Sequence, residues 1–274
     1  MLLGKYYIEM INTKWQCRIS PTLGNGFAGT PNETWGTTDY KDIVLPTVFF
    51  GCYGLPDLFA VRQHRGRKAI FWAGTDVTYF INGYWLDDRG EFRLDPKIVG
   101  PYLNRYCENW CENDIERIEL ARFGIDAKVC PSYLGDIKKI RPSYNKSHIL
   151  KAYISVSGDD FKAYGWDKLD ILAKENPKIL FYCYGNVKPF QVHERNIILR
   201  GRLTQKQMDK EIKKMHYALR LNKHDGFSEI IAKAVMMEHS VISAIKYPFL
   251  ALGRKGARKW LLQNVNRFPW NSKI

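Results

Sequence analysis

Long apolar segments are missing from this chain, and their absence limits where the protein can reside. No apolar run reaches the roughly 18 to 20 residues that a membrane-spanning helix needs. The first ten residues contain Lys5 and Glu9, so they do not form the apolar core of a secretory signal. We therefore expect a cytoplasmic protein without a membrane-spanning helix.

Cysteine and histidine are few and scattered, which argues against a metal centre. The chain has six of each, and only Cys107 and Cys111 come near a ligand spacing. No second pair of cysteines or histidines accompanies these two. The pattern predicts reduced thiols in a cytoplasmic protein and no metal-ligating residues.

Common catalytic motifs are missing as well. The sequence contains no G-x-S-x-G, no H-E-x-x-H, no G-x-x-x-x-G-K-[ST], and no G-x-G-x-x-G followed by a suitable acidic residue. These absences disfavour a serine hydrolase, a zinc protease, a P-loop nucleotidase and a dinucleotide-binding enzyme.

Acidic residues are scarce in the second half. Residues 1–150 carry 19 Lys and Arg against 17 Asp and Glu, whereas residues 151–274 carry 23 against 11. The segment 251–274 has six basic residues and no acidic one. This asymmetry indicates a phosphate-bearing or otherwise anionic partner; a solvated surface that only confers solubility is the alternative.

The second half alternates short strands with helices. The strands are expected at 152–156, 179–184, 197–199, 217–221 and 241–243. Helices are expected at 166–174, from a capping box formed by Thr204 and Gln207, and at 229–238. Such alternation predicts right-handed βαβ units around a parallel sheet, which is a Rossmann-like domain.

The first half shows the same pattern less regularly. Strands are expected at 48–50, 69–72 and 126–130, with a helix near 56–64 and another from Asn113 to Phe123, ended by Gly124. Residues 24–42 are expected to form a loop, and a linker is expected near 140–147. We predict an α/β protein with two Rossmann-like domains facing a cleft. The predicted domains are 1–147, 148–250 and a basic amphipathic segment, 251–274.

The turn His224-Asp225-Gly226-Phe227-Ser228 is the best candidate site. It follows a predicted strand and precedes a helix whose first N–H groups and partial positive charge suit a diphosphate. Gly226 allows close approach of a ligand, Ser228 can cap the helix, and Asp225 can accept hydrogen bonds from sugar hydroxyls. A plain strand–turn–helix connection without ligand is the alternative.

The segment HDGFSEIIAKA resembles the E-x7-E region of retaining GT-B glycosyltransferases, in the glycogen-synthase-like group 1 branch. In that region an acidic residue and Gly-Phe open a helix, and a second glutamate follows. Asp225 matches the first acid, whereas Lys233 stands in place of the second. A lysine cannot accept hydrogen bonds from ribose hydroxyls as a glutamate does.

The resemblance covers about residues 45–245 and implies a GT-B fold and metal-independent transfer of a hexose with retention. It implies no cofactor, and a nucleotide-sugar donor, most simply a UDP-sugar, as substrate. Asp225 would hold the donor sugar. Phosphates and nucleotide would be bound by Arg200, Arg202, Arg220, His224, Gly226, Phe227, Ser228 and Lys233.

In the first half, AIFWAGTDV resembles the family's acceptor-side strand and turn, which places Thr75 and Asp76 in the cleft, with Asp76 as a second catalytic candidate. Capping of the next segment by Asp76 is the alternative, and GNGFAG at 24–29 is a candidate counterpart of the family's glycine-rich loop. The acceptor is open: protein, nucleic acid or a glycan lipid at a membrane surface.

The tail, 251–274, would form a basic amphipathic helix suited to a membrane surface or a nucleic acid, or would cross back to brace the first domain. A peripheral position at a membrane is therefore an alternative location. Two other functions stay open: a sugar-nucleotide or glycan-binding protein without catalysis, and a nucleic-acid-binding protein, including one that glycosylates DNA.

Overall fold

The computed structural model describes residues 14–23, 30–83, 95–143, 147–156, 162–186 and 192–271. Contacts divide the chain into two compact units. Unit 1 comprises Met1–Gly135 and Asn264–Ile274, and unit 2 comprises Asp136–Gln263. The division thus falls before the predicted linker at 140–147, and residues 264–274 belong to unit 1.

Unit 1 is built on a six-stranded sheet in which every neighbouring pair is parallel. Its strands, in spatial order, are β2 (Thr38–Asp39), β1 (Gln16–Ile19), β3 (Thr47–Phe50), β4 (Lys68–Trp72), β5 (Glu108–Cys111) and β6 (Ala127–Val129). The residues of β3 are buried, and so are four of the five in β4, as expected for strands covered on both faces.

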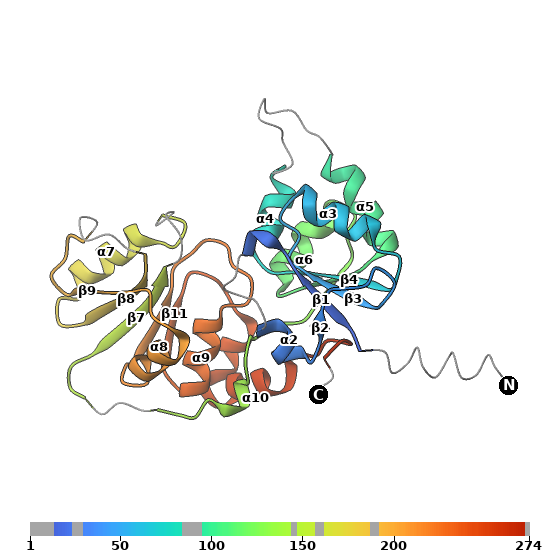
Figure 1. Ribbon diagram of the computed structural model, residues 1–274. Helices are drawn as coiled ribbons and strands as arrows, with labels where there is room; N and C mark the ends of the chain where they lie inside the picture. The colour runs from blue at the N-terminus through green and yellow to red at the C-terminus, as the bar shows by residue number, and fades with distance from the viewer. Residues whose placement is uncertain are drawn as a thin grey trace. The chain divides into compact units, whose positions relative to one another are not determined.

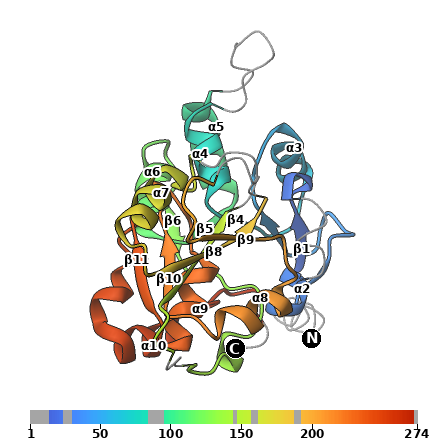
Figure 2. The same ribbon diagram turned by 90° about the vertical axis from the view of Figure 1, so that its left-hand side faces the viewer.

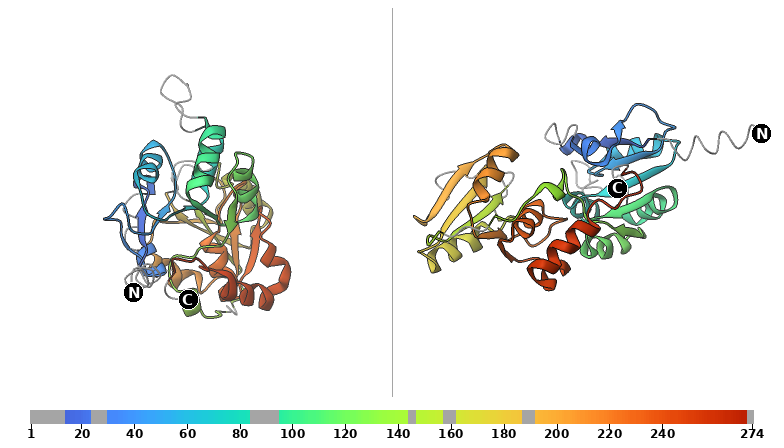
Figure 3. Two further views of the ribbon diagram at one scale, coloured as in Figure 1. Left: turned by 90° about the vertical axis from the view of Figure 1, so that its right-hand side faces the viewer. Right: turned by 90° about the horizontal axis from the view of Figure 1, so that it is seen from below.

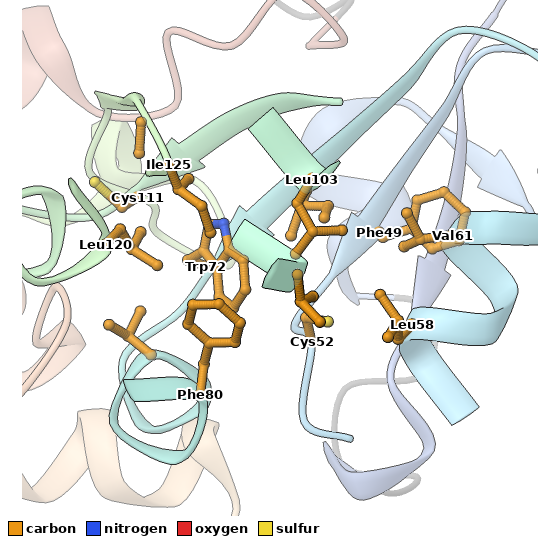
Figure 4. Close-up of a cluster of buried hydrophobic side chains, with 14 residues drawn as sticks. Phe49, Cys52, Leu58, Val61, Trp72, Phe80, Leu103, Cys111, Leu120 and Ile125 are labelled. Atoms are coloured by element: carbon orange, nitrogen blue, oxygen red, sulfur yellow. The ribbon is translucent and has the colours of Figure 1, made fainter. Parts of the chain in front are cut away.

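Helices cover both faces of this sheet. They are α2 (Thr30–Trp35), α3 (Leu55–Gln63), α4 (Thr75–Ile81), α5 (Pro96–Tyr106) and α6 (Asp114–Ala121). Figure 1 shows α3 to α6 on one side of the strands and α2 on the other. Figure 4 shows the core on the α3–α6 side, where Phe49 and Trp72 of the sheet lie among Val61, Phe80 and Leu103 of the helices.

Residues after 263 complete the second core of unit 1. Phe268 and Trp270 stack with ring centroids 4.6 Å apart and pack with Trp35 of α2 and Phe71 of β4. Asn266 accepts a hydrogen bond from the backbone N–H of Tyr133 at 2.9 Å. Figure 3 shows this last segment, in dark red, returning to unit 1.

Unit 2 has a five-stranded, wholly parallel sheet. Its strands, in spatial order, are β11 (Ser240–Ser243), β10 (Tyr217–Arg220), β7 (Lys151–Val156), β8 (Leu180–Gly185) and β9 (Ile197–Gly201). The helices are α7 (Trp166–Glu175), α8 (Gln205–Ile212), α9 (Glu229–Met237) and α10 (Gly253–Asn264), with short turns η2 (Ile137–Lys139) and η4 (Pro248–Leu252). Figures 1 and 2 show α7 on one face of the sheet and α8 and α9 on the other.

The chain reverses its direction across the unit 2 sheet between β7 and β10. From β7 the chain builds outward through β8 to β9, and it then returns to β10, beside β7, and continues outward to β11. At such a switch point the connections leave neighbouring strands in opposite directions, so a crevice opens at the carboxyl ends of the strands. The ends of β7 and β10 are therefore where unit 2 offers a ligand site.

Sequence and structure agree on most elements. Each strand predicted in the second half is present, and Thr204 and Gln207 form the predicted capping box. Asn113 accepts from the N–H of Glu116, and Gly124 has φ of 77°. The prediction of a loop over 24–42 was wrong for α2 and β2, while 24–29 lie outside the described residues. No helix in the described part of the chain is long and apolar enough to span a membrane.

Candidate functional site

The turn after β10 is held by an ion pair. Arg220, the last residue of β10, donates from Nε and Nη2 to the two carboxylate oxygens of Asp225, both at 2.6 Å. Tyr247 donates its hydroxyl to Asp225 Oδ2 at 3.1 Å, and the Arg220 guanidinium lies 5.6 Å from the ring centre of Tyr164. Burial lowers the pKa of Arg220, but the charge and hydrogen bonds of Asp225 outweigh it and raise that pKa overall. The guanidinium of Arg220 therefore stays charged.

A cavity of about 230 Å³ opens beside this pair. It lies at the carboxyl ends of β7 and β10, between α8 and the first turns of α9. Its lining residues are Ser155, Met208, Arg220, Asp225, Phe227, Ser228, Glu229, Ile230 and Lys233. The structure thus brings five of the predicted site residues, Arg220, Asp225, Phe227, Ser228 and Lys233, to the switch point of unit 2.

Helix α9 begins at this cavity. Ser228 occupies the N-cap position, but its side chain makes no capping hydrogen bond, so the expected capping role of Ser228 is wrong. Its side chain instead forms part of the cavity wall. Gly226 is buried, and the glycines with positive φ in the described residues do not include it. Half-buried His224 accepts a hydrogen bond at its carbonyl from Asn222 Nδ2 at 3.5 Å.

Lys233 is nearly buried and forms an ion pair across to α8. Its Nζ lies 2.7 Å from Asp209 Oδ1, and its side chain is 5% exposed against 33% for Asp209. The lysine in place of the family's second acid therefore faces an acid from the neighbouring helix. Lys233 lines the cavity, and its ion pair with Asp209 links α9 to α8.

Arg200 and Arg202 lie away from this cavity. Arg200, near the end of β9, pairs with Glu211 of α8 at 2.5 and 2.9 Å. Arg200 lines a second cavity, of about 340 Å³, which shares no lining residue with the first. Arg202 is exposed in the connection from β9 to α8. Arg200, Arg202 and Arg220, which the sequence assigned to one phosphate site, therefore do not line the same cavity.

Asp76 lies in the interior of unit 1, with none of its surface exposed. Its carboxylate accepts hydrogen bonds from the N–H groups of Cys52, Ala73 and Val77 at 2.9 to 3.0 Å. Burial raises its pKa to about 6, although these hydrogen bonds act to lower it. A carboxylate enclosed in this way joins the ends of β3 and β4 and cannot contact a solute. We therefore leave Asp76 out of the site, while Thr75 is exposed at the start of α4.

Sequence reasoning missed residues that line the cavity and residues that bind its lining side chains. Asp209 and Met208 come from α8, Ser155 from β7, and Tyr247, which bonds Asp225, from the chain after β11. Ser155 lies near the end of β7, and its place in the site could have been predicted only if β7 were known to lie beside β10 in the sheet. In the described residues, no three His, Cys, Asp or Glu side chains gather into a group that could hold a metal ion.

No protein-family model matches the chain, and no curated protein matches it in sequence. Solved structures do resemble it. TarM, a protein of S. aureus, gives a TM-score of 0.53 at 14% identity, covering 80% of this chain and 47% of TarM. Sucrose-phosphate synthase from Thermosynechococcus elongatus gives 0.53 at 11%, covering 78% and 57%. Anabaena HepE, solved with UDP and glucose, gives 0.52 at 10%, covering 88% and 83%.

These similar structures are GT-B glycosyltransferases, and the chain has the GT-B fold: an α/β protein with two Rossmann-like, parallel-sheet units. The predicted fold is confirmed. The chain spans about half the length of TarM and of sucrose-phosphate synthase. Because its identity to all three structures is 14% or less, the likeness establishes the fold alone.

Proposed function

We propose that this protein is a glycosyltransferase that moves a hexose from a nucleoside diphosphate sugar to an acceptor. The observation that carries the proposal is the cavity at the switch point of unit 2, lined by the first turns of α9 and by the Arg220–Asp225 pair. A GT-B fold makes transfer the favoured chemistry, and UDP in the HepE structure favours a UDP-sugar.

The cavity suits the diphosphate and sugar portion of such a donor. Its volume of about 230 Å³ lies below the roughly 300 to 1,000 Å³ that encloses a drug-sized ligand, so it would hold part of the donor. The partial positive charge at the start of α9 would face the diphosphate. Asp225 lines the cavity, and its carboxylate, fixed by Arg220 and Tyr247, is an acceptor of the kind that binds sugar hydroxyls.

The reaction would proceed with retention and without a metal ion. The bond from the anomeric carbon to the diphosphate oxygen breaks, and its electron pair leaves on that oxygen. The acceptor oxygen forms the new bond and releases its proton to the departing phosphate. Charge that develops on the diphosphate would be stabilised by the helix start and by Lys233, which is the main catalytic contribution available here.

A donor screen tests this proposal. Thermal shift and diphosphate release are measured with UDP-, GDP-, ADP- and CMP-sugars, with and without EDTA. We expect one class to stabilise the protein and to release diphosphate slowly in both conditions. Asp225→Asn should abolish the shift, whereas Asp167→Asn, at an exposed position on α7, should keep it. Stabilisation without any release would indicate a binding protein instead, and no shift with any sugar would refute the donor site.

Nucleic-acid binding is a second candidate, favoured by α10. Its Ala257 and Leu261 are buried, while Arg254, Lys255 and Lys259 are exposed. A helix packed by its apolar side and basic on its outer side suits a phosphate backbone. DNA affinity measured between about 50 and 200 mM salt would fall steeply if this reading holds. Weak, salt-independent binding would eliminate it.

A further inference from the structure

The outer sides of α3 and α5 form one exposed surface of unit 1. Val61 of α3 and Leu103 of α5 are buried in the same core, and the opposite sides of both helices are exposed. Burial raises the pKa of Tyr102 on α5, while the charge of Arg62 on α3 acts to lower it, so this guanidinium lies near this ring. Figure 1 shows the two helices on the same side of the sheet. The α3–α5 face, as we call this surface, is centred on Phe59, Arg62, Lys97, Ile98, Arg105 and Tyr106.

Large apolar side chains are exposed on the α3–α5 face. Ile98 has 71% of its surface exposed, Tyr106 50% and Phe59 49%. The rings of Tyr102 and Tyr106, one helical turn apart, lie 4.8 Å from centre to centre. Isolated exposed apolar residues are common on protein surfaces, whereas a group of them on two neighbouring helices indicates an interaction site.

The charged side chains of this face are positive. Arg62, Lys97 and Arg105 are exposed, and the ion pairs formed among the described residues involve none of the three. Asp57 is the sole acidic residue in the sequences of the two helices, and it is buried and hydrogen-bonded inside unit 1. Asp95 precedes α5 and caps it by accepting from the N–H of Lys97. The exposed side chains of both helices are therefore uncharged or positive, which suits an anionic partner.

We propose that the α3–α5 face binds the surface of a bilayer that contains anionic lipids. Such a surface offers phosphates to the cations and the boundary of the acyl chains to the exposed apolar side chains. Tyrosine suits the depth between these two layers, because its ring is apolar and its hydroxyl is polar. Arginine and lysine carry their charges on long apolar stems, so they can reach headgroups while their stems cover apolar surface.

Two other partners match this face less well. A second copy of the chain, bound through the same face, would bring cations against cations, since neither helix exposes an acidic side chain there. A nucleic acid would pair with the cations but would offer no apolar layer to Ile98 and Phe59. An anionic bilayer supplies both kinds of contact at once.

Co-sedimentation of the full chain with vesicles tests the inference. One set of vesicles is phosphatidylcholine alone, and the other contains about 30% phosphatidylglycerol as the anionic lipid. We expect the anionic vesicles to bind the wild-type chain at least about tenfold more tightly than the neutral ones, and this preference to shrink as the salt concentration rises.

A pair of charge reversals separates this face from the other basic helix. Arg62→Glu with Arg105→Glu should weaken binding to the anionic vesicles at least about tenfold. The matched control is Lys255→Glu with Lys259→Glu on α10, which makes the same change of charge at exposed positions and should weaken binding less than about twofold. Thermal melting verifies that both double variants fold.

A second pair tests the apolar contact. Phe59→Ser with Ile98→Ser should weaken binding at least about fivefold, because two side chains that enter the bilayer surface are lost. The matched control is Ile118→Ser with Ile171→Ser, on α6 and α7, where the side chains are 50% and 56% exposed. This control should bind as the wild type does.

Three results would overturn the inference: a wild-type chain that leaves anionic vesicles unbound, equal losses in the two charge pairs, or a larger loss in the α10 pair. Sedimentation velocity without lipid covers the second copy, because self-association that the α3–α5 variants abolish, with vesicles unbound, would identify that occupant instead. The inference does not rest on the proposed transferase function, since the donor cavity belongs to unit 2. A failed donor screen with intact vesicle binding would refute only the transferase.

Discussion

Asp76 and Asp225 look alike in the sequence and occupy different settings in the structure. Each follows a parallel strand and precedes or begins a helix, at the carboxyl edge of its sheet. Asp76 is enclosed and bound by three backbone N–H groups, whereas Asp225 is bound by the side chains of Arg220 and Tyr247 and lines a cavity. Backbone partners make an acid part of the scaffold; side-chain partners at a cavity leave it able to contact a ligand.

Removing Asp225 should give the largest effect. Asp225→Ala deletes the proposed sugar contact and leaves Arg220, 14% exposed, without its partner. We expect kcat/KM for diphosphate release to fall at least about 100-fold, and stability to fall by about 1 to 3 kcal/mol. Steady-state kinetics and urea unfolding measure the two. Turnover of the variant at the wild-type rate would show that Asp225, like Asp76, does not contact the donor.

Asp76→Asn should affect stability and spare the donor site. The amide nitrogen cannot accept from the N–H of Cys52, so one buried donor loses its partner, a loss of about 1 to 3 kcal/mol. Urea unfolding measures it, and diphosphate release by the folded variant should stay within twofold of the wild type. A large kinetic defect with unchanged stability would return Asp76 to the list of catalytic candidates.

The pH dependence of stability sharpens the same comparison. Burial raises the pKa of Asp76 from 3.8 to about 6, so between these values the folded chain holds a proton that the unfolded chain has lost. The stability contribution of Asp76 therefore falls as the pH rises through this window. Asp76→Asn should flatten the wild-type curve there, and its stability deficit should be larger near the lower end than at neutral pH. Parallel curves would contradict the raised pKa.

Lys233 and Asp209 should show a smaller, coupled effect. Each of Lys233→Met and Asp209→Asn breaks the ion pair at 2.7 Å and leaves a charge of the partner in place. Because Asp209 is one-third exposed, solvent moderates the loss, and we expect about 1 kcal/mol of coupling in a double-mutant cycle of unfolding free energies. Additive single effects would show that the two charges do not interact.

Arg200→Ala should change donor affinity least, by less than twofold, because Arg200 lines the second cavity and not the first. Arg220→Ala is the matched comparison and should weaken donor binding at least tenfold, as measured by calorimetry. Similar losses in both variants would show that the donor reaches the second cavity as well.

Strong periodicity and turn residues made much of the fold predictable. The capping box at Thr204, the Asn113 cap and Gly124 each act within a few residues, so sequence alone was sufficient to identify them. Strand β5 and helix α2 were missed because their burial comes from tertiary partners; Trp35, for example, is enclosed by Phe268 and Trp270. Local patterns carry no record of such distant contacts.

The site was predictable in its turn and not in its walls. The segment from Asp225 to Lys233 is continuous, and its position between a strand and a helix followed from the sequence. Asp209 and Tyr247 reach the same place from other elements, which requires the strand order to be known. The pairing of Arg220 with Asp225 also could not be foreseen. Each had been predicted to contact the donor separately, whereas in the structure the two side chains bind each other.

The last residues of the described chain have a consequence for how the protein is made. Phe268 and Trp270 belong to the core formed by Trp35, Phe50 and Phe71, more than 190 positions earlier in the sequence. On the ribosome, domains generally fold in the order of their synthesis. The aromatic core of unit 1 can therefore be completed only after unit 2 has been translated and Phe268 and Trp270 have left the ribosome. Unit 2, continuous in sequence, is free to fold while its predecessor is still incomplete.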